Sequence, residues 1–177
     1  DNHLAITLEY IDGITLEEAF IGKNRPITEI LQAFIQLADT LSKLHLKGII
    51  HKDINGRNIL WIEKEKRPVI IDFGICNRID LVSNNLGNPD KIKGTLTHMS
   101  PEQTGRVNRI IDSRSDLYSL GVTMYHIFTG KLPFESKDSL ELVHFHIAKS
   151  VPLIHLENNA VPEVISRIVA KLMAKNA

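Results

Sequence analysis

Residues 49–60, IIHKDINGRNIL, mix polar and aliphatic side chains in a way that constrains the fold more than any other segment of the chain. The polar side chains that need an explanation are His51, Asp53, Arg57 and Asn58. A solvated loop has no need of so many β-branched neighbours, and a buried strand does not tolerate such polarity without a task for it. The segment therefore predicts a catalytic loop between two short strands.

Hydrophobic spacing around this loop predicts short strands first and helices later. A β-rich run over residues 4–11 ends at Asp12-Gly13, and Thr15 is the expected N-cap of a short helix. The runs 58–62 and 68–72 are separated by the charged turn EKEKR and predict a β-hairpin. Residues 74–100 lose periodicity and predict a long functional loop. Apolar residues at helical spacing predict helices over 28–48, 115–129, 138–149 and 162–175.

The composition is that of one soluble globular domain, or of part of one. Of the 177 residues, 43% are hydrophobic and 24% are charged. Lys plus Arg and Asp plus Glu both number 21, so no net field favours nucleic acid or an anionic membrane as a partner. No apolar run reaches the ~18 residues of a spanning helix, and no basic start precedes a short apolar segment, so we expect neither a membrane segment nor a signal peptide.

Two further features concern the compartment and the start of the chain. The single cysteine, Cys76, cannot form an internal disulfide, which suits a reducing compartment and a cytoplasmic protein. The first residue is not Met, and residues 4–11 already resemble a strand. We therefore expect the chain to begin in mid-domain.

Four motifs that carry polar side chains follow one another along the chain. They are His51-Lys52-Asp53 with Asn58, Asp72-Phe73-Gly74 after the hairpin, Gly94-Thr95 followed by Ser100-Pro101-Glu102, and SDLYSLGV at 115–122. In this order, with these elements between them, the motifs resemble the protein kinase family. The resemblance covers essentially the whole chain and includes LEYIDG at 8–13, which resembles the kinase hinge.

This resemblance implies a mainly α (α+β) fold, namely the large C-terminal lobe of a kinase with short β-hairpins at the cleft and the N-lobe absent. Residues 1–13 would be the hinge and the last strand of the missing N-lobe, and residues 14–177 the C-lobe, truncated at its C-terminus. Within the C-lobe, the catalytic loop would be 51–58, the metal motif 72–74 and the activation segment 72–102.

The resemblance also assigns chemical roles. Phosphoryl transfer needs positioning, metal ions that neutralise the phosphates, and a group that orients the attacking hydroxyl. By resemblance, Asp53 accepts or orients the proton of the substrate hydroxyl, while Asn58 and Asp72 hold Mg²⁺ through oxygen ligands. The expected cofactors are thus ATP and Mg²⁺.

Departures from the family pattern bear on the substrate. Asn55 stands where serine/threonine kinases place a lysine on the transferred phosphate, and Arg57 is expected to take over that task. Thr95 matches the threonine that serine/threonine kinases place beside the catalytic aspartate, which favours serine/threonine over tyrosine specificity. Lys52 stands where many kinases have arginine, and it cannot grip a phosphate in the bidentate way of a guanidinium.

Nucleotide contacts are implied at the start of the chain and on the first hairpin strand. Glu9 and Ile11 would offer backbone groups to the adenine edge, Leu60 would form the adenine floor and Leu8 would be the gatekeeper. Thr15 is a further expected contact with the nucleotide.

Other residues are expected to be structural. By resemblance, His51 and Phe73 pack in an internal spine, and Asp116 hydrogen-bonds the backbone of the loop 51–58. His144 and His146 lie about 200° apart around a helix, so one should be buried and one exposed. Glu102, whose family partner is a later arginine, would pair with Arg106 or Arg114, reach water, or lie unpaired.

Three functions remain open from the sequence. The first is a protein kinase that phosphorylates serine or threonine in a protein substrate, with its own N-lobe upstream. The second is a pseudokinase that serves as a scaffold or regulatory domain. The third, a small-molecule phosphotransferase, is disfavoured by Asp72-Phe73-Gly74 together with Thr95 and the peptide-docking element at 100–102. The string GTLTHMSPEQTGRVNR also resembles bacterial multidomain sensors with an ATPase and a histidine-kinase module, which implies further signalling domains.

Overall fold

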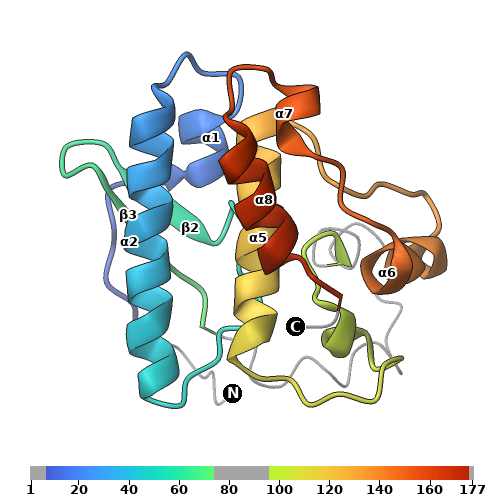
Figure 1. Cartoon of the computed structure of the whole chain (residues 1–177). Coiled ribbons are helices and arrows are strands. Elements are labelled where there is room, and N and C mark those ends of the chain that lie inside the picture. Colours follow the sequence, from blue (N-terminus) through green and yellow to red (C-terminus); the bar gives the residue numbers. More distant parts are fainter. Residues whose placement is uncertain (1–6, 74–95, 176–177) are drawn as a thin grey trace.

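The computed structural model describes residues 7–73 and 96–175 and shows a mainly helical chain with one small antiparallel sheet (Figure 1). The mainly helical class expected from the sequence is confirmed. The helices are α1 (Leu16–Phe20), α2 (Ile27–Leu46), α5 (Ser113–Thr129), α6 (Ser139–Ala148), α7 (Ile154–Glu157) and α8 (Glu163–Leu172), and η2 (Pro101–Thr104) is a 3-10 helix. The four long helices expected from apolar spacing are α2, α5, α6 and α8.

The sheet consists of β1 (Ile14–Thr15), β2 (Ile59–Ile62) and β3 (Arg67–Ile70), in that spatial order. The strands β2 and β3 form the expected hairpin, in which Leu60 lies opposite Val69. The strand expected over 4–11 is wrong for its described part, because residues 7–11 pair with no strand of the described chain. Leu8 and Tyr10 in this segment are 82% and 87% exposed, so β propensity alone does not make a strand there.

Thr15 turns the chain from the sheet into α1. Its Oγ1 accepts a hydrogen bond from the backbone N–H of Glu18 at 3.2 Å, and the Glu18 carboxylate accepts one from the backbone N–H of Thr15 at 2.9 Å. This reciprocal capping box satisfies two backbone donors that the helix cannot satisfy itself. The expected N-cap is therefore confirmed.

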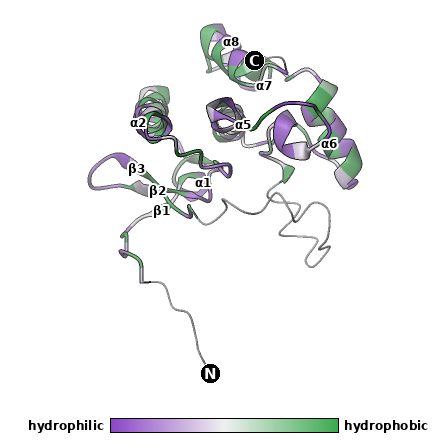
Figure 2. Ribbon diagram, turned by 90° about the horizontal axis from the view of Figure 1, so that it is seen from below, coloured by the Kyte–Doolittle hydropathy of each residue, from purple (hydrophilic) through white to green (hydrophobic). Residues whose placement is uncertain are grey.

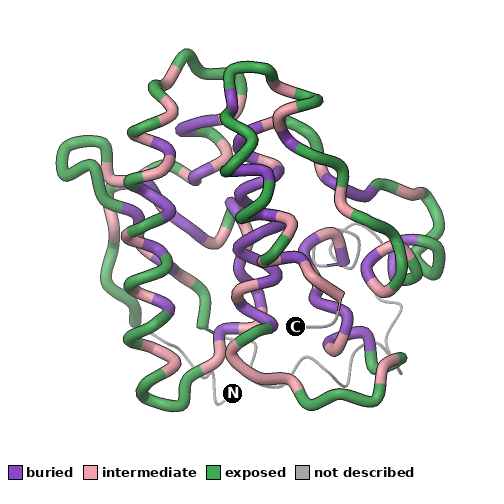
Figure 3. Tube along the Cα trace, viewed as in Figure 1, coloured by how far each residue is buried: buried purple, intermediate pink, exposed green. Residues whose placement is uncertain are grey.

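Helix α5 is the centre of the core. It is buried along most of its length (Figure 3), with α2 packed on one side and α8 on another (Figures 1 and 2). Gly121 of α5 allows the close approach of α8, since an added Cβ would lie 2.8 Å from Cγ of Met173 and 2.9 Å from Cβ of Leu172. Any larger residue at 121 would force the two helices apart.

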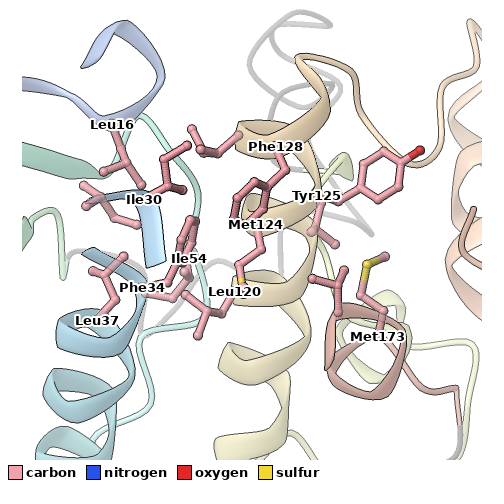
Figure 4. Packing of buried hydrophobic residues seen from close by; sticks show 14 of the residues in the cluster. Leu16, Ile30, Phe34, Leu37, Ile54, Leu120, Met124, Tyr125, Phe128 and Met173 are labelled. Carbon is pink, nitrogen blue, oxygen red and sulfur yellow. The ribbon is translucent and has the colours of Figure 1, made fainter. Parts of the chain in front are cut away.

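The loop 51–58 is fixed to this core by Ile54, which is fully buried. Figure 4 shows Ile54 between the side chains of α2, such as Phe34 and Leu37, and those of α5, such as Leu120 and Met124. Burying an aliphatic side chain of this size stabilises the fold by about 1.5–3 kcal/mol. The aliphatic residues among the polar ones at 49–60 thus anchor the loop.

Two short elements escape sequence periodicity. Helix α7 and η2 each contain four residues, which is too few for a helical pattern to show. Most of the long loop expected over 74–100, including residues 74–95, lies outside the described residues.

Candidate active site

Asp116 of α5 holds the loop 51–58 from below. Its side chain is fully buried and accepts hydrogen bonds from the backbone N–H groups of His51 at 2.9 Å and Lys52 at 2.7 Å. The Nε2 atom of His45, at the end of α2, lies 2.8 Å from Oδ2 of the same carboxylate. Three donors on one buried carboxylate fix the start of the loop, and the contact expected for Asp116 is present.

Lys52 adopts a strained backbone conformation within this anchored segment. Its φ is 69°, in the left-handed region that residues other than glycine rarely adopt. Its carbonyl oxygen accepts a hydrogen bond from Nε2 of Gln103 at 2.7 Å, which ties the loop to η2. The loop is therefore held by α5 and by η2 together.

Asp53 and Asn58 form the polar centre of the loop. Nδ2 of Asn58 donates to Oδ2 of Asp53 at 2.7 Å and to the Asp53 carbonyl oxygen at 3.0 Å. Nδ2 of Asn55 also donates to Oδ1 of Asp53 at 3.2 Å, while Oδ1 of Asn55 accepts from the backbone N–H groups of Arg57 and Asn58 at 3.0 and 3.2 Å. The two amides close the loop on the Asp53 carboxylate.

The environment of Asp53 raises the pKa of its carboxyl group. Asp53 is 9% exposed, and this burial raises the pKa of its carboxyl group above the ordinary value. The negative charge of Asp72 raises the pKa of Asp53 further, while the amides of Asn58 and Asn55 and the charge of His51 oppose the rise. A raised pKa brings a carboxylate closer to the range in which a general base works well.

Asp72 and Phe73 follow the hairpin and return to the loop. The backbone N–H of Ile71 donates to the carbonyl oxygen of Asn58 at 2.9 Å, and Nε2 of His51 lies 3.1 Å from the carbonyl oxygen of Ile71. Asp72 then takes a φ of 63°, a conformation that costs energy and is common at functional sites. The hairpin thus brings Asp72 to the same end of the sheet as Asn58.

His51 is the core residue that the sequence predicts. It is 3% exposed, its Nδ1 accepts from the backbone N–H of Asp53 at 3.3 Å, and its ring meets that of Phe73 edge to face with 4.9 Å between the centroids. Phe73 is less buried than expected, since 47% of it is exposed.

Arg57 belongs to the same loop and contacts α1. Its side chain is 71% exposed, and its Nε lies 3.4 Å from Oε2 of Glu17 on α1. Gly56 allows this approach of α1, because an added Cβ would lie 2.6 Å from Cγ of Glu17. The backbone N–H of Leu16 also donates to the Gly56 carbonyl oxygen at 3.0 Å. Glu17 lies 40 residues before Arg57 and shares no motif with it, so the sequence does not indicate this contact.

Of the expected nucleotide contacts, Thr15 and Leu60 lie on paired strands of the sheet, and Leu8, Glu9 and Ile11 lie in the segment that precedes it. Leu60 is half-buried on β2, beside Thr15 on β1. Ile11 is half-buried, and Glu9 and Leu8 are exposed. Thr95, the remaining expected catalytic residue, lies outside the described residues.

Asn58 and Asp72 are the residues expected to hold Mg²⁺, and their donor atoms decide whether they suit this ion. Within 7–73 and 96–175, no three His, Cys, Asp or Glu side chains cluster as a metal site. Asn58 and Asp72 supply one amide and one carboxylate oxygen, and the charge of Asp72 adds a minor contribution to the pKa of Asp53, which burial raises. Carboxylate and amide oxygens beside a second carboxylate suit Mg²⁺, which takes few protein ligands and keeps several waters. The donor set therefore fits this ion.

Two expectations outside the loop can be compared with the structure. His146 is buried, with its Nδ1 2.9 Å from the hydroxyl of Tyr118, whereas His144 is exposed, as expected. Glu102 accepts a hydrogen bond from Oγ of Ser115 at 2.5 Å, and Ser115 was not among its expected partners. The hydrogen bond from Arg114 to Asp112 is the main cause that raises the pKa of Arg114, and the charges of Asp112 and then of Glu102 act in the same direction.

Comparison with known proteins decides the family. Residues 1–176 match the family model described as the protein kinase domain. The chain belongs to the protein kinase family. The resemblance seen in the four motifs is thereby confirmed.

Curated kinases resemble the chain along nearly all of its length. The probable serine/threonine-protein kinase PknB of Lactococcus lactis is 28% identical over 173 residues, or 97% of this chain and 27% of the relative. PrkC of Bacillus subtilis is 29% identical over 99% of this chain and 26% of the relative, and PknB of Mycolicibacterium smegmatis is 32% identical over 97% and 27%. The chain therefore spans about a quarter of the length of these kinases. Among its described helices, none is long and apolar enough to cross a membrane.

Proposed function

We propose that this chain is the large C-terminal lobe of a serine/threonine protein kinase, which transfers the γ-phosphate of ATP to hydroxyl groups of a protein substrate. The observation that carries the proposal is the pair Asp53 and Asn58, joined at 2.7 Å in a loop that Asp116 anchors, within a chain that matches the protein kinase domain. The names of the three relatives support serine or threonine as the acceptor.

Asp53 is the proposed base that orients the acceptor hydroxyl. The hydrogen bonds from Asn55 and Asn58 fix the direction of its carboxylate, and burial raises its pKa. Orientation of a nucleophile by a fixed group removes entropy from the barrier, and a raised pKa strengthens the base. The acceptor proton is thus held at Asp53 while the hydroxyl oxygen attacks.

Asn58 and Asp72 are the residues that would hold Mg²⁺ with the phosphates of ATP. When bound, the ion neutralises phosphate charge during transfer. Because Nδ2 of Asn58 is engaged by Asp53, its Oδ1 is the atom that would face the ion. Asp72 would approach from the strained turn after β3.

The nucleotide would lie along the exposed end of the sheet. Leu60 would support the adenine ring, Glu9 and Ile11 would offer backbone groups to its edge, and Thr15 would lie near the ribose. An N-lobe upstream of the hinge segment 1–13 would cover the other face. Leu8 and Tyr10, 82% and 87% exposed, are apolar surface that such a lobe would bury.

We also propose for Arg57 and Thr95 the roles that the family pattern implies. Arg57 would have to leave Glu17, 3.4 Å away, to reach a transferred phosphate beside Asp53. An exposed pair of this kind contributes only about 0–1 kcal/mol, so the exchange is energetically easy. A cytoplasmic location and further signalling domains also stay predictions.

The test is phosphate transfer by the whole protein that contains this chain. Incubation with γ-labelled ATP, Mg²⁺ and a generic protein substrate should label serine or threonine, and Asp53→Ala should abolish the labelling. Asp39→Ala, at an exposed residue of α2, is the matched control and should leave it unchanged. The 177-residue chain alone should be inert, because its own residues enclose the nucleotide on one side only. Unlabelled substrate, or labelling that survives Asp53→Ala, would contradict the proposal.

A further inference from the structure

Gln103 of η2 is only 9% exposed and uses both ends of its side-chain amide. Its Nε2 donates to the carbonyl oxygen of Lys52 at 2.7 Å. Its Oε1 accepts hydrogen bonds from the backbone N–H and from Oγ of Ser100, at 3.1 and 2.9 Å. Because a backbone N–H only donates and a carbonyl oxygen only accepts, these partners leave the amide one orientation. Gln103 therefore joins the N-terminus of η2 to the residue that precedes Asp53.

The contacts between Gln103 and Ser100 form a capping box at the start of η2. In a capping box the side chain of the third helical residue only has to accept a hydrogen bond from the N-cap residue, so glutamate serves as well as glutamine. The carboxylate of a glutamate, however, has no hydrogen to donate. It is thus the contact with Lys52, and not the cap, that requires an amide at position 103.

The peptide group between Lys52 and Asp53 is fixed at both of its ends. The peptide is trans, so its carbonyl and its N–H point in opposite directions. Gln103 holds the carbonyl, and Nδ1 of His51 lies 3.3 Å from the N–H of Asp53. Nε2 of His51 lies 3.1 Å from the carbonyl oxygen of Ile71, so the tautomer with its hydrogen on Nε2 serves both contacts. Together, Gln103 and His51 set the plane of the peptide that carries Asp53.

The backbone of Lys52 does not favour this orientation by itself. Its φ of 69° costs a lysine free energy and persists only where neighbouring contacts impose it. Asp116 accepts from the N–H of Lys52 at 2.7 Å, and Gln103 donates to its carbonyl oxygen. Both supports rest on the first turn of α5, since Glu102 of η2 accepts a hydrogen bond from Oγ of Ser115, the residue before Asp116. Without the amide of Gln103, Lys52 can release its strain by turning the carbonyl.

We propose that Gln103 is a positioning residue, whose amide holds the peptide between Lys52 and Asp53 in the strained orientation that aims the Asp53 carboxylate at the acceptor hydroxyl. Asn55 and Asn58 fix the carboxylate within its own loop, whereas Gln103 fixes the main chain that carries it. A displacement of a reacting group by about 1 Å can slow a reaction on the order of 100-fold. The role of Gln103 rests on the proposed function, because it presupposes that Asp53 is the base.

The first test is Gln103→Glu in the whole protein, which keeps the acceptor for Ser100 and removes the donor to Lys52. The turnover number should fall by about 10- to 100-fold, while KM for ATP and KM for a protein substrate stay close to their wild-type values. Gln36→Glu is the matched control, because Nε2 of Gln36 donates at 3.1 Å to the carbonyl oxygen of Lys66, another lysine with a positive φ, of 50°, in the turn of the hairpin. This control should keep wild-type turnover. Wild-type turnover in Gln103→Glu, or losses of binding as large as the loss of turnover, would overturn the proposal.

Gln103→Met separates positioning from stability. Methionine has nearly the same size and shape as glutamine, but it loses the capping contacts with Ser100 as well as the donor to Lys52. Gln103→Glu and Gln103→Met should therefore lose turnover to a similar extent, whichever of them unfolds at the lower urea concentration. If the loss of turnover instead follows the loss of stability, Gln103 only supports the fold and the proposal is overturned. If the new carboxylate prevents folding, Gln103→Met carries the same prediction for turnover and KM.

Amide hydrogen exchange in the whole protein provides a test that does not depend on catalysis. In both Gln103 variants the N–H of Asp53 should exchange about 10-fold faster than in the wild type, because the freed peptide can turn away from His51. Gln36→Glu should leave this rate unchanged. An unchanged rate in both Gln103 variants would overturn the proposal, even in an active kinase. Faster exchange in a protein that phosphorylates nothing would show that Gln103 holds the peptide and that the proposed kinase function is wrong.

Discussion

Asn58 holds Asp53 in one orientation, because its Nδ2 donates to Oδ2 of Asp53 at 2.7 Å and to the Asp53 carbonyl oxygen at 3.0 Å. With the amide nitrogen engaged in this way, Oδ1 is the atom of Asn58 that can turn towards a cation. The two residues form one unit, in which the proposed metal ligand also aims the proposed base. A change at either residue should therefore be felt at the other.

Asn58→Asp tests this coupling. The change replaces the donor by a carboxylate, removes both hydrogen bonds to Asp53 and places a second negative charge beside it. Turnover should fall by about 100-fold, and the acidic limb of the pH–rate profile should move to higher pH, because the new charge raises the pKa of Asp53. The control is Asn24→Asp, at an exposed loop residue, which should behave as the wild type. An unchanged pH profile in Asn58→Asp would show that Asn58 does not act on Asp53.

The ionised side chain of Asp53 should lower the free energy of unfolding at neutral pH. Burial and the charge of Asp72 raise the pKa of Asp53 in the fold, so the folded chain binds its proton more tightly than the unfolded chain does. Stability is therefore lost as the pH rises from the unfolded pKa, about 3.9, through the raised folded value. Asp53→Asn should stabilise the chain at pH 7 and have little effect at pH 3. Urea unfolding, followed by the fluorescence of Trp61, measures this in the 177-residue chain, and a destabilised variant at pH 7 would be the opposite result.

Among the residues that hold the loop 51–58, Asp116 should be the one whose replacement destabilises the chain most. Asp116→Ala leaves the backbone N–H groups of His51 and Lys52 and the imidazole of His45 without their acceptor. Each buried donor that loses its acceptor costs about 1–3 kcal/mol in the free energy of unfolding. Asp39→Ala removes an exposed pair with Lys43 and should cost less than about 1 kcal/mol in the same urea experiment. Equal effects of the two changes would mean that Asp116 does not anchor the loop.

A substitution at Gly121 tests the close contact between α5 and α8. In an exposed helix, Gly→Ala stabilises by about 1 kcal/mol, but here the new Cβ would meet Cγ of Met173 at 2.8 Å. Gly121→Ala should therefore destabilise the chain by about 1–3 kcal/mol. The penalty should be smaller when Met173 is already replaced by Ala, which a double-mutant cycle measures. A stabilising Gly121→Ala would show that the helices can separate without cost.

The spacing of apolar residues was sufficient to predict the helix and the hairpin that carry the site. The helix from Thr28 to Gly48 could be predicted because its apolar residues repeat along one face, and the hairpin because two short apolar runs flank a charged turn. The role of Asp116 was implied by the resemblance of SDLYSLGV to the protein kinase family. The segment 7–11 shows the limit of propensity, because a strand needs a partner as well as β-forming residues.

Contacts between distant segments could not be predicted. Glu17 meets Arg57 across 40 positions, and Gln103 reaches the carbonyl oxygen of Lys52 across 51. Gly56 was the available signal for the first contact, since it leaves room for α1, but a glycine does not say which side chain will approach.

The most direct test of the central claim compares Asp53→Asn with Asp72→Asn in the whole protein, by measuring the Kd for ATP with Mg²⁺ and the turnover number of each. If Asp53 orients the hydroxyl and Asp72 holds the metal, Asp53→Asn should keep nearly the wild-type Kd and lower turnover by about 100-fold or more. Asp72→Asn should instead weaken the binding of ATP in the presence of Mg²⁺ and have less effect on binding in its absence. Equal losses of binding and turnover in both variants, or full activity in either, would contradict the assignment of these two carboxylates.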